Sequence, residues 1–99
     1  MPFGKGHLVV RLGDFPKANP AEVSVAINPK NPTNVIATSL VTGIEPRSVS
    51  YVYTSANSGQ TWKMQKTANP ENRIQGDDSV AFDQEGRAFR SYISFRGLR

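Results

Sequence analysis

Polar side chains that could bind a ligand gather in two segments with the composition of loops. Their members are charged or amide residues, namely Glu45, Arg47, Asn72, Arg73, Asp77 and Asp78. The adjacent carboxylates of Asp77 and Asp78, with an arginine nearby, could hold a sugar or a cation, because ligand sites use a few convergent polar groups. The simpler interpretation is that both segments are polar because loops run over the surface.

Residues for metal or cofactor chemistry are scarce. The chain has no Cys and a single His, His7, so it can build neither a disulfide framework nor a cluster of Cys and His ligands. We therefore expect no metal site and no cofactor. The lack of Cys fits either redox compartment, so it leaves the localisation unknown.

Composition limits the chain to one small domain. It has 99 residues, of which 37% are hydrophobic and 20% charged, values of neither a membrane protein nor a clearly disordered chain. No apolar run approaches the roughly 20 residues of a membrane helix, and the run at residues 8–10 is too short for a secretory signal. The net charge of +4 permits an anionic partner, glycan or nucleic acid, without requiring one.

Short runs of alternating or β-branched residues between turn residues predict strands. In the first run, Val23, Val25 and Ile27 alternate with Ser24 and Ala26, so the two sets point to opposite sides. The small residues leave one face open to close approach, and we expect the apolar set to fill the other. The expected strands are residues 22–28, 35–42, 49–55, 61–66, 78–83 and 88–95.

The third and fourth runs predict a hairpin over residues 51–66, with its turn at residues 57–59. Gly59 can take a positive φ without penalty, and the Asn57 side chain can fold onto the backbone two residues on. Part of the sequence also occurs twice. Ser24-Val-Ala-Ile-Asn matches Ser79-Val-Ala-Phe-Asp, and 79 − 24 gives an offset of 55 residues. A repeat of short strands indicates a repeated β architecture.

The hairpin carries a recognisable motif. Ser55-x-Asn57-x-Gly59-x-Thr61-Trp62 resembles the Asp-box, or BNR repeat, of sialidase-like β-propellers, in which Asp usually stands at the position of Asn57. The resemblance implies an all-β fold: an antiparallel four-stranded propeller-blade meander, as a fragment of a sialidase-like β-propeller. It also implies that the five motif residues are structural, against the rival interpretation that Trp62 stacks on a glycan.

The resemblance divides the chain into an N-terminal loop with a possible short strand, a first blade, an inter-blade connection and half of a second blade. Their bounds are residues 1–20, 21–66, 67–77 and 78–99. Two residues depart from the family pattern, since Arg90 stands where an apolar residue is usual and Asp78 where Pro is common. One blade and half of a second cannot close a ring, and their sheets keep open edges. We expect a fragment that self-associates or needs the remaining blades.

The resemblance implies a glycan-binding or exo-glycosidase-related function, without a complete active site in this chain. Sialidases clamp the substrate carboxylate with several arginines and use a Tyr nucleophile. The nearest match to the family's aromatic-Arg-Ile-Pro signature is Arg73-Ile74, flanked by Asn72 and Gln75, so we assign no catalytic residue. In the propeller layout, residues 41–48, 66–78 and 14–20 would face the mouth of the ring. Proteins of this family are often secreted or on the cell surface.

Two other functions stay open. Propellers host many activities, so the chain could be a non-catalytic binding or interaction scaffold. Residues 87–99 interleave Arg with aromatic residues, a composition found on nucleic-acid-binding surfaces. The same tail can equally be a strand with Phe89, Ile93 and Phe95 on one face, which makes a nucleic acid the less favoured partner.

Overall fold

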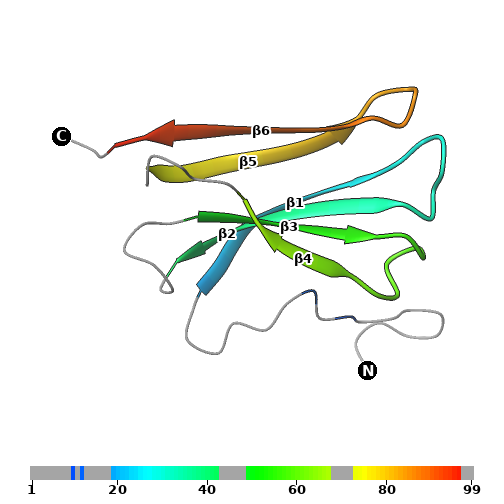
Figure 1. The fold of residues 1–99 in the computed structure, drawn as a ribbon, viewed down its shortest axis with the longest axis horizontal. Coiled ribbons are helices and arrows are strands. Elements are labelled where there is room, and N and C mark those ends of the chain that lie inside the picture. The colour runs from blue at the N-terminus through cyan, green and yellow to red at the C-terminus, as the bar shows by residue number, and fades with distance from the viewer. Residues whose placement is uncertain (1–9, 11, 13–18, 43–48, 68–72, 97–99) are drawn as a thin grey trace.

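The computed structural model describes residues 10, 12, 19–42, 49–67 and 73–96, and these contain strands and turns but no helix (Figure 1). The strands are β1 (Asn19–Ile27), β2 (Val35–Thr42), β3 (Val49–Ser55), β4 (Lys63–Lys66), β5 (Ile74–Phe82) and β6 (Ala88–Phe95). β1 to β4 form one four-stranded antiparallel sheet in chain order, and β5 and β6 form a two-stranded antiparallel sheet. The predicted all-β class is confirmed. Within the described part of the chain, no helix is available to span a membrane.

Strand boundaries in the first sheet differ slightly from the expected ones. β1 begins at Asn19 rather than Glu22, and β4 begins at Lys63 rather than Thr61. β4 starts later because the residues before it belong to the turn. The hairpin itself is confirmed, since β3 and β4 pair antiparallel, with Tyr51 opposite Lys66 and Thr54 opposite Lys63.

The start of β5 is a larger correction. The strand begins at Ile74, so the connection expected over residues 67–77 is shorter and the strand expected at Asp78 is longer. The sequence around Gly76 and Asp77 has the composition of a loop. The strand accommodates it with a β-bulge, where the register against β6 shifts between Gly76 and Ser79.

β5 and β6 repeat the beginning of the first sheet, as the Ser-Val-Ala pattern predicted. β5 starts 55 residues after β1, from position 19 to position 74, and both strands have 9 residues. Each strand also carries its bulge at the same place, and the extra residue has a φ of 53° both at Glu22 and at Asp77. We therefore call β1–β4 unit 1 and β5–β6 unit 2.

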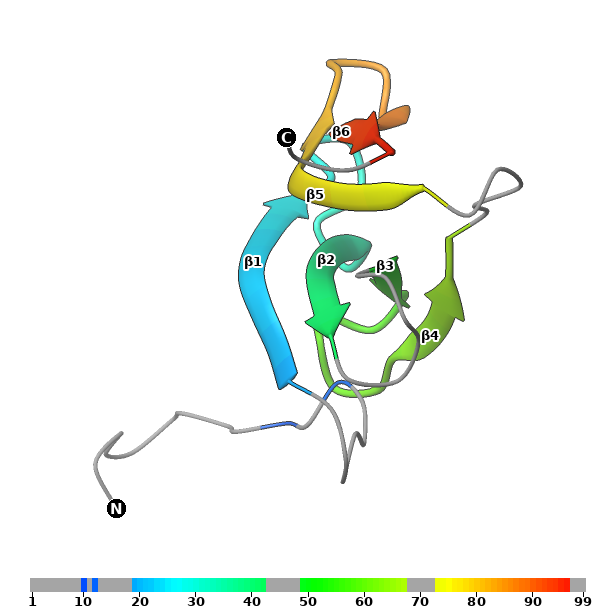
Figure 2. The ribbon, with the colours of Figure 1, turned by 90° about the vertical axis from the view of Figure 1, so that its left-hand side faces the viewer.

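Unit 2 lies on one face of unit 1 through β5, which contacts β1, β2 and β3 (Figure 2). The backbone N of Val80 donates to Ser24 Oγ over 3.3 Å. On β3, the backbone N of Ser50 donates to Gln75 Oε1 over 3.1 Å. Each of these bonds joins a backbone N–H of one unit to a side chain of the other, and among the described residues no backbone ladder joins the two sheets.

The buried apolar residues belong mainly to β2, β3 and β5. They are Val35, Ile36, Ala37, Val41, Val49, Tyr53 and Val80. The side chains of Val23, Val25 and Ile27 point to one side of β1, as their alternation predicted, but that side is open. Their exposed fractions are 67%, 61% and 61%. The expectation that these three side chains pack against other residues is therefore wrong for unit 1.

Candidate functional site

The turn between β3 and β4 is held by the side chains of the Asp-box-like motif. Ser55 Oγ accepts hydrogen bonds from the backbone N of Gly59 over 2.9 Å and from that of Asn57 over 3.3 Å, and it donates to Asn57 Oδ1 over 2.9 Å. Asn57 Oδ1 also accepts from the backbone N of Thr61 over 2.9 Å, while Asn57 Nδ2 donates to Thr61 Oγ1 over 2.7 Å. The neutral side chain of Asn57 therefore forms hydrogen bonds with Ser55 at the start of the turn and with Thr61 at its end.

Trp62 closes the same turn. Its Nε1 donates to the backbone O of Gly59 over 2.8 Å, and Gly59 has a φ of +87°, in the left-handed region that favours glycine. Ser55, Asn57, Gly59, Thr61 and Trp62 thus all take part in the hydrogen bonds of this turn. The indole also lines a shallow hollow of about 280 Å³ together with Asn34 and Lys63. Stacking of Trp62 on a glycan thus stays an untested alternative.

Three turns gather at one end of the molecule. The backbone N of Ser58 donates to the O of Thr33 over 2.8 Å, which joins the β3–β4 turn to the β1–β2 turn. Asn28 Nδ2 lies 3.5 Å from the O of Gly86, which brings the β5–β6 turn alongside. Because the strands are antiparallel, β2 ends and β3 begins at the opposite end. Of the predicted binding residues, Arg73 and Asp77 lie near the beginning of β5.

The structure describes only part of the predicted binding set. Glu45, Arg47 and Asn72 lie outside the described residues. Arg73 precedes β5, and its Nη2 donates to the backbone O of Ser94 over 3.1 Å.

The two adjacent carboxylates do not act as a pair. Asp77 is exposed at the bulge, whereas the side chain of Asp78 is only 1% exposed. Asp77, which was expected in the connection before the strand, lies within β5, as does Asp78, the expected first residue of that strand. The Asp78 carboxylate is directed at Ser50 and Arg90.

Asp78 belongs to a polar cluster between the units, formed by Ser50, Thr67, Gln75, Asp78 and Arg90. Asp78 Oδ1 accepts from Ser50 Oγ, and its Oδ2 accepts from Arg90 Nε, both over 2.5 Å. Gln75 Oε1 accepts from Thr67 Oγ1 over 3.0 Å in addition to its bond with the Ser50 backbone. We call this group the inter-unit cluster.

The charges in the inter-unit cluster compensate each other. The side chain of Arg90 is 18% exposed and lies against Asp78, while its Cζ stacks 3.9 Å above the centroid of the Tyr92 ring. The Nη2 atom of Arg90 is buried without a hydrogen-bond partner. Asp78 and Arg90 thus form an ion pair within unit 2, and Asp78 also accepts a hydrogen bond from Ser50 of unit 1. Their position on neighbouring expected strands was the one signal in the sequence for this pair.

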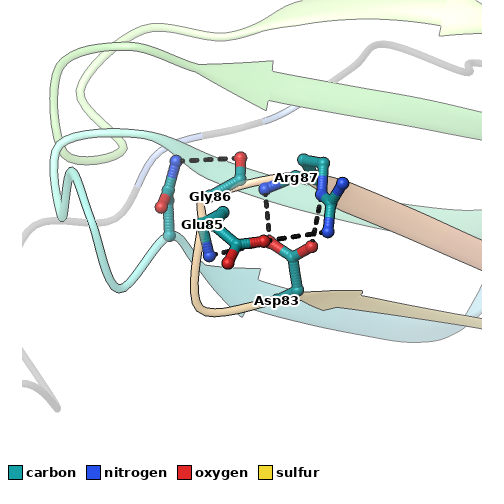
Figure 3. A network of polar contacts seen from close by, with 5 residues as sticks. Asp83, Glu85, Gly86 and Arg87 are labelled. Carbon is teal, nitrogen blue, oxygen red and sulfur yellow. Dashed lines mark hydrogen bonds and ion pairs between the residues drawn. The ribbon is translucent and has the colours of Figure 1, made fainter.

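The turn of unit 2 is organised by a carboxylate (Figure 3). Asp83 Oδ1 accepts from the backbone N of Arg87 over 2.8 Å and of Glu85 over 3.0 Å, and the Arg87 guanidinium pairs with both carboxylates. The hydrogen bond from the Arg87 backbone is the main cause that lowers the pKa of Asp83. At the equivalent position of unit 1, Asn28 Oδ1 accepts from the backbone N of Lys30 over 2.9 Å.

The described part of the chain contains no group of three His, Cys, Asp or Glu side chains that could hold a metal ion. Comparison of the chain with protein-family models, with curated proteins and with solved structures found no match.

Proposed function

We propose that this chain forms one blade and half of a second blade of a sialidase-like β-propeller, and that it serves as a glycan-binding scaffold without hydrolytic activity of its own. The hydrogen-bonded turn at residues 55–62 carries the proposal, because each residue of the Asp-box-like motif forms or accepts a hydrogen bond there, with Gly59 at a positive φ. Such a turn is typical of one architecture, and it places no constraint on the residues at the ends of the blade.

The stacking of the units supports this architecture. A propeller consists of four-stranded antiparallel blades around an axis, and a repeat unit buries its faces against its neighbours. Unit 1 is a four-stranded antiparallel sheet, and β5 begins the next unit by packing on its face. The repeated bulge at Glu22 and Asp77 gives both units the same starting geometry.

The burial of Asp78 supports a role without hydrolysis. Glycoside hydrolysis uses a pair of carboxylates or, in sialidases, a Tyr nucleophile. Asp78 is bound to Ser50 and Arg90 between the units, so it cannot share a substrate with Asp77. The polar residues left for glycan binding are Arg73 and Asp77 near the start of β5, together with Glu45, Arg47 and Asn72, which lie outside the described residues.

Nucleic-acid binding has less support. Of the basic tail, Arg87 pairs with Asp83 and Glu85, and Arg90 pairs with Asp78. Each carboxylate reduces the positive potential that would attract a phosphate backbone. We therefore do not propose this function.

A glycan array combined with a fluorogenic sialoside assay tests the proposal. We expect binding to at least one glycan class and no hydrolysis. Arg47→Ala should weaken that binding about tenfold or more, because a hydrogen bond to a charged group contributes about 1.5–3 kcal/mol. The control Glu85→Gln, in the β5–β6 turn, should leave it unchanged.

Each part of the proposal can fail separately. Turnover of the sialoside that resists further purification would contradict the lack of hydrolysis. Absence of binding to every glycan would contradict the scaffold function. Binding to DNA or RNA with a steep salt dependence would favour the nucleic-acid alternative.

A further inference from the structure

The contact between unit 1 and unit 2 has two sides, and each side occurs again elsewhere on the chain. We call the side of unit 2 that packs on unit 1 its entry face, which carries Asp78 and Val80. We call the side of unit 1 that receives it its exit face, which carries Ser24 and Ser50. In the structure, Val80 is 7% exposed and its backbone N bonds to Ser24 Oγ.

The repeat places a second entry face on unit 1. Given the offset of 55 residues, Val25 is equivalent to Val80 and Ile27 to Phe82. Val80 is buried, but Val25 and Ile27 are each 61% exposed. The β1 part of the entry face of unit 1 is thus an exposed apolar strip whose counterpart in unit 2 is covered, while the neighbouring Val35 and Ala37 of β2 are buried.

The repeat likewise places the β1–β2 part of a second exit face on unit 2, whose described residues contain no counterpart of β3 and Ser50. Ser79 and Ala81 are equivalent to Ser24 and Ala26, and the strand registers make Phe89 equivalent to Ile36. Ile36 is 9% exposed beneath the contact, whereas Phe89 is 56% exposed. The exposed exit face of unit 2 therefore combines small residues with an uncovered aromatic ring.

We propose that the chain associates head to tail, with the exit face of unit 2 of one copy on the entry face of unit 1 of a second copy. The proposed occupant is a second copy because each open face has its matching partner, already used in the internal contact, at the other end of the same chain. In this arrangement the backbone N of Val25 bonds to Ser79 Oγ of the neighbouring copy, as Val80 bonds to Ser24. The inference rests on the internal repeat and is independent of the glycan proposal.

A contact of this kind joins different surfaces of the two copies. Heterologous contacts produce closed rings when the rotation closes and open filaments when it does not. Each added copy covers one apolar face and presents another. Association should therefore continue beyond a dimer unless the ring closes.

Charged substitutions on the two faces test the orientation. Sedimentation velocity of the unmodified chain should show species larger than the 10.9 kDa monomer. Val25→Asp blocks the entry face and Phe89→Asp blocks the exit face, so each variant alone should be monomeric. The matched control Gln84→Asp makes the same charge change in the β5–β6 turn and should associate like the unmodified chain.

Mixing the two variants separates head-to-tail association from the alternatives. The Val25→Asp chain keeps its exit face and the Phe89→Asp chain keeps its entry face, so a 1:1 mixture should form a dimer that grows no further. A strictly monomeric unmodified chain would overturn the proposal. The same conclusion would follow if only one variant lost association, as in a contact between like faces, or if neither did, as in pairing of exposed strand edges.

Cysteine cross-linking gives a second test that does not depend on the folding of the Asp variants. Because the chain has no Cys, Val25→Cys and Ser79→Cys each introduce a single thiol. Oxidation of their mixture should yield the mixed disulfide dimer in excess over either symmetric dimer, and the double variant should yield a ladder of multimers. Statistical proportions of the three dimers, or an equal yield with Gln84→Cys in place of Ser79→Cys, would overturn the proposed contact.

Discussion

Removal of the Asp78 carboxylate should strongly destabilise the contact between the units. The side chain is 1% exposed and accepts hydrogen bonds from Ser50 and Arg90. Asp78→Ala leaves a largely buried guanidinium without its counter-charge. Breaking a buried ion pair costs about 3–5 kcal/mol. Because Arg90 keeps 18% exposure, we expect a loss at the lower end, about 3 kcal/mol.

A double-mutant cycle distinguishes the ion pair from simple loss of packing. Replacing both partners, as Asp78→Val with Arg90→Leu, should be far less damaging than either single change suggests, because apolar residues often replace a buried pair without loss. Unit 1 already has Val23 at the position equivalent to Asp78. We expect the loss in the double variant to be smaller than the sum of the single losses by about 2–3 kcal/mol.

Urea unfolding followed by circular dichroism measures these differences. With a slope of about 1–3 kcal/mol per molar urea, a loss of about 3 kcal/mol lowers the midpoint by about 1–3 M. Asp77→Asn is the matched control, since its side chain is exposed and Asn tolerates the positive φ. An Asp78→Ala midpoint equal to that of the control, or additive changes in the cycle, would refute the reasoning.

Two further predictions concern the turns. Gly59→Ala should destabilise the chain by more than about 1 kcal/mol, because an L-residue at a φ of +87° is strained; an unchanged melting temperature would contradict this. Asp83→Asn should lower the unfolding free energy at pH 7, because the pKa of Asp83 is lowered by its bonds to Arg87. The ionised carboxylate stabilises the fold fully above its ordinary pKa of about 3.9, and this contribution is lost as the pH falls through the lower folded value. The gap between the variant and the unmodified chain should therefore narrow in strong acid, and a gap independent of pH would show that the charge is unimportant.

The features of the fold that depend on residues close together in the chain could be predicted from the sequence. Alternation located β1, and the turn residues around Gly59 located the β3–β4 hairpin. The Ser-Val-Ala pattern located β5 as a repeat of β1. All three signals act within one strand or one turn, where side-chain period and backbone preference dominate.

The inter-unit cluster could not be derived in the same way. The contact of Asp78 with Arg90 depends on the register of β5 against β6, and that with Ser50 depends on how the two sheets stack. The bulge at Asp77 decides which of two adjacent carboxylates points inward. A non-glycine residue with positive φ has no clear local signature, so the sequence could not show that Asp77 lies within the strand or that the Asp78 side chain points inward. The exposure of the Val25 side chain could not be predicted either, since it depends on whether another element packs against that side of β1.

The arrangement of backbone pairing has a consequence for the motions of the chain. Every strand of the described structure pairs with a neighbour in sequence, so each ladder closes locally and should form early in folding. Unit 2 is attached to unit 1 by side chains such as Ser24 and Gln75 rather than by a ladder. The β5–β6 hairpin can therefore open as a cooperative unit while β2 and β3 stay paired, and its amide protons should exchange with solvent sooner than theirs.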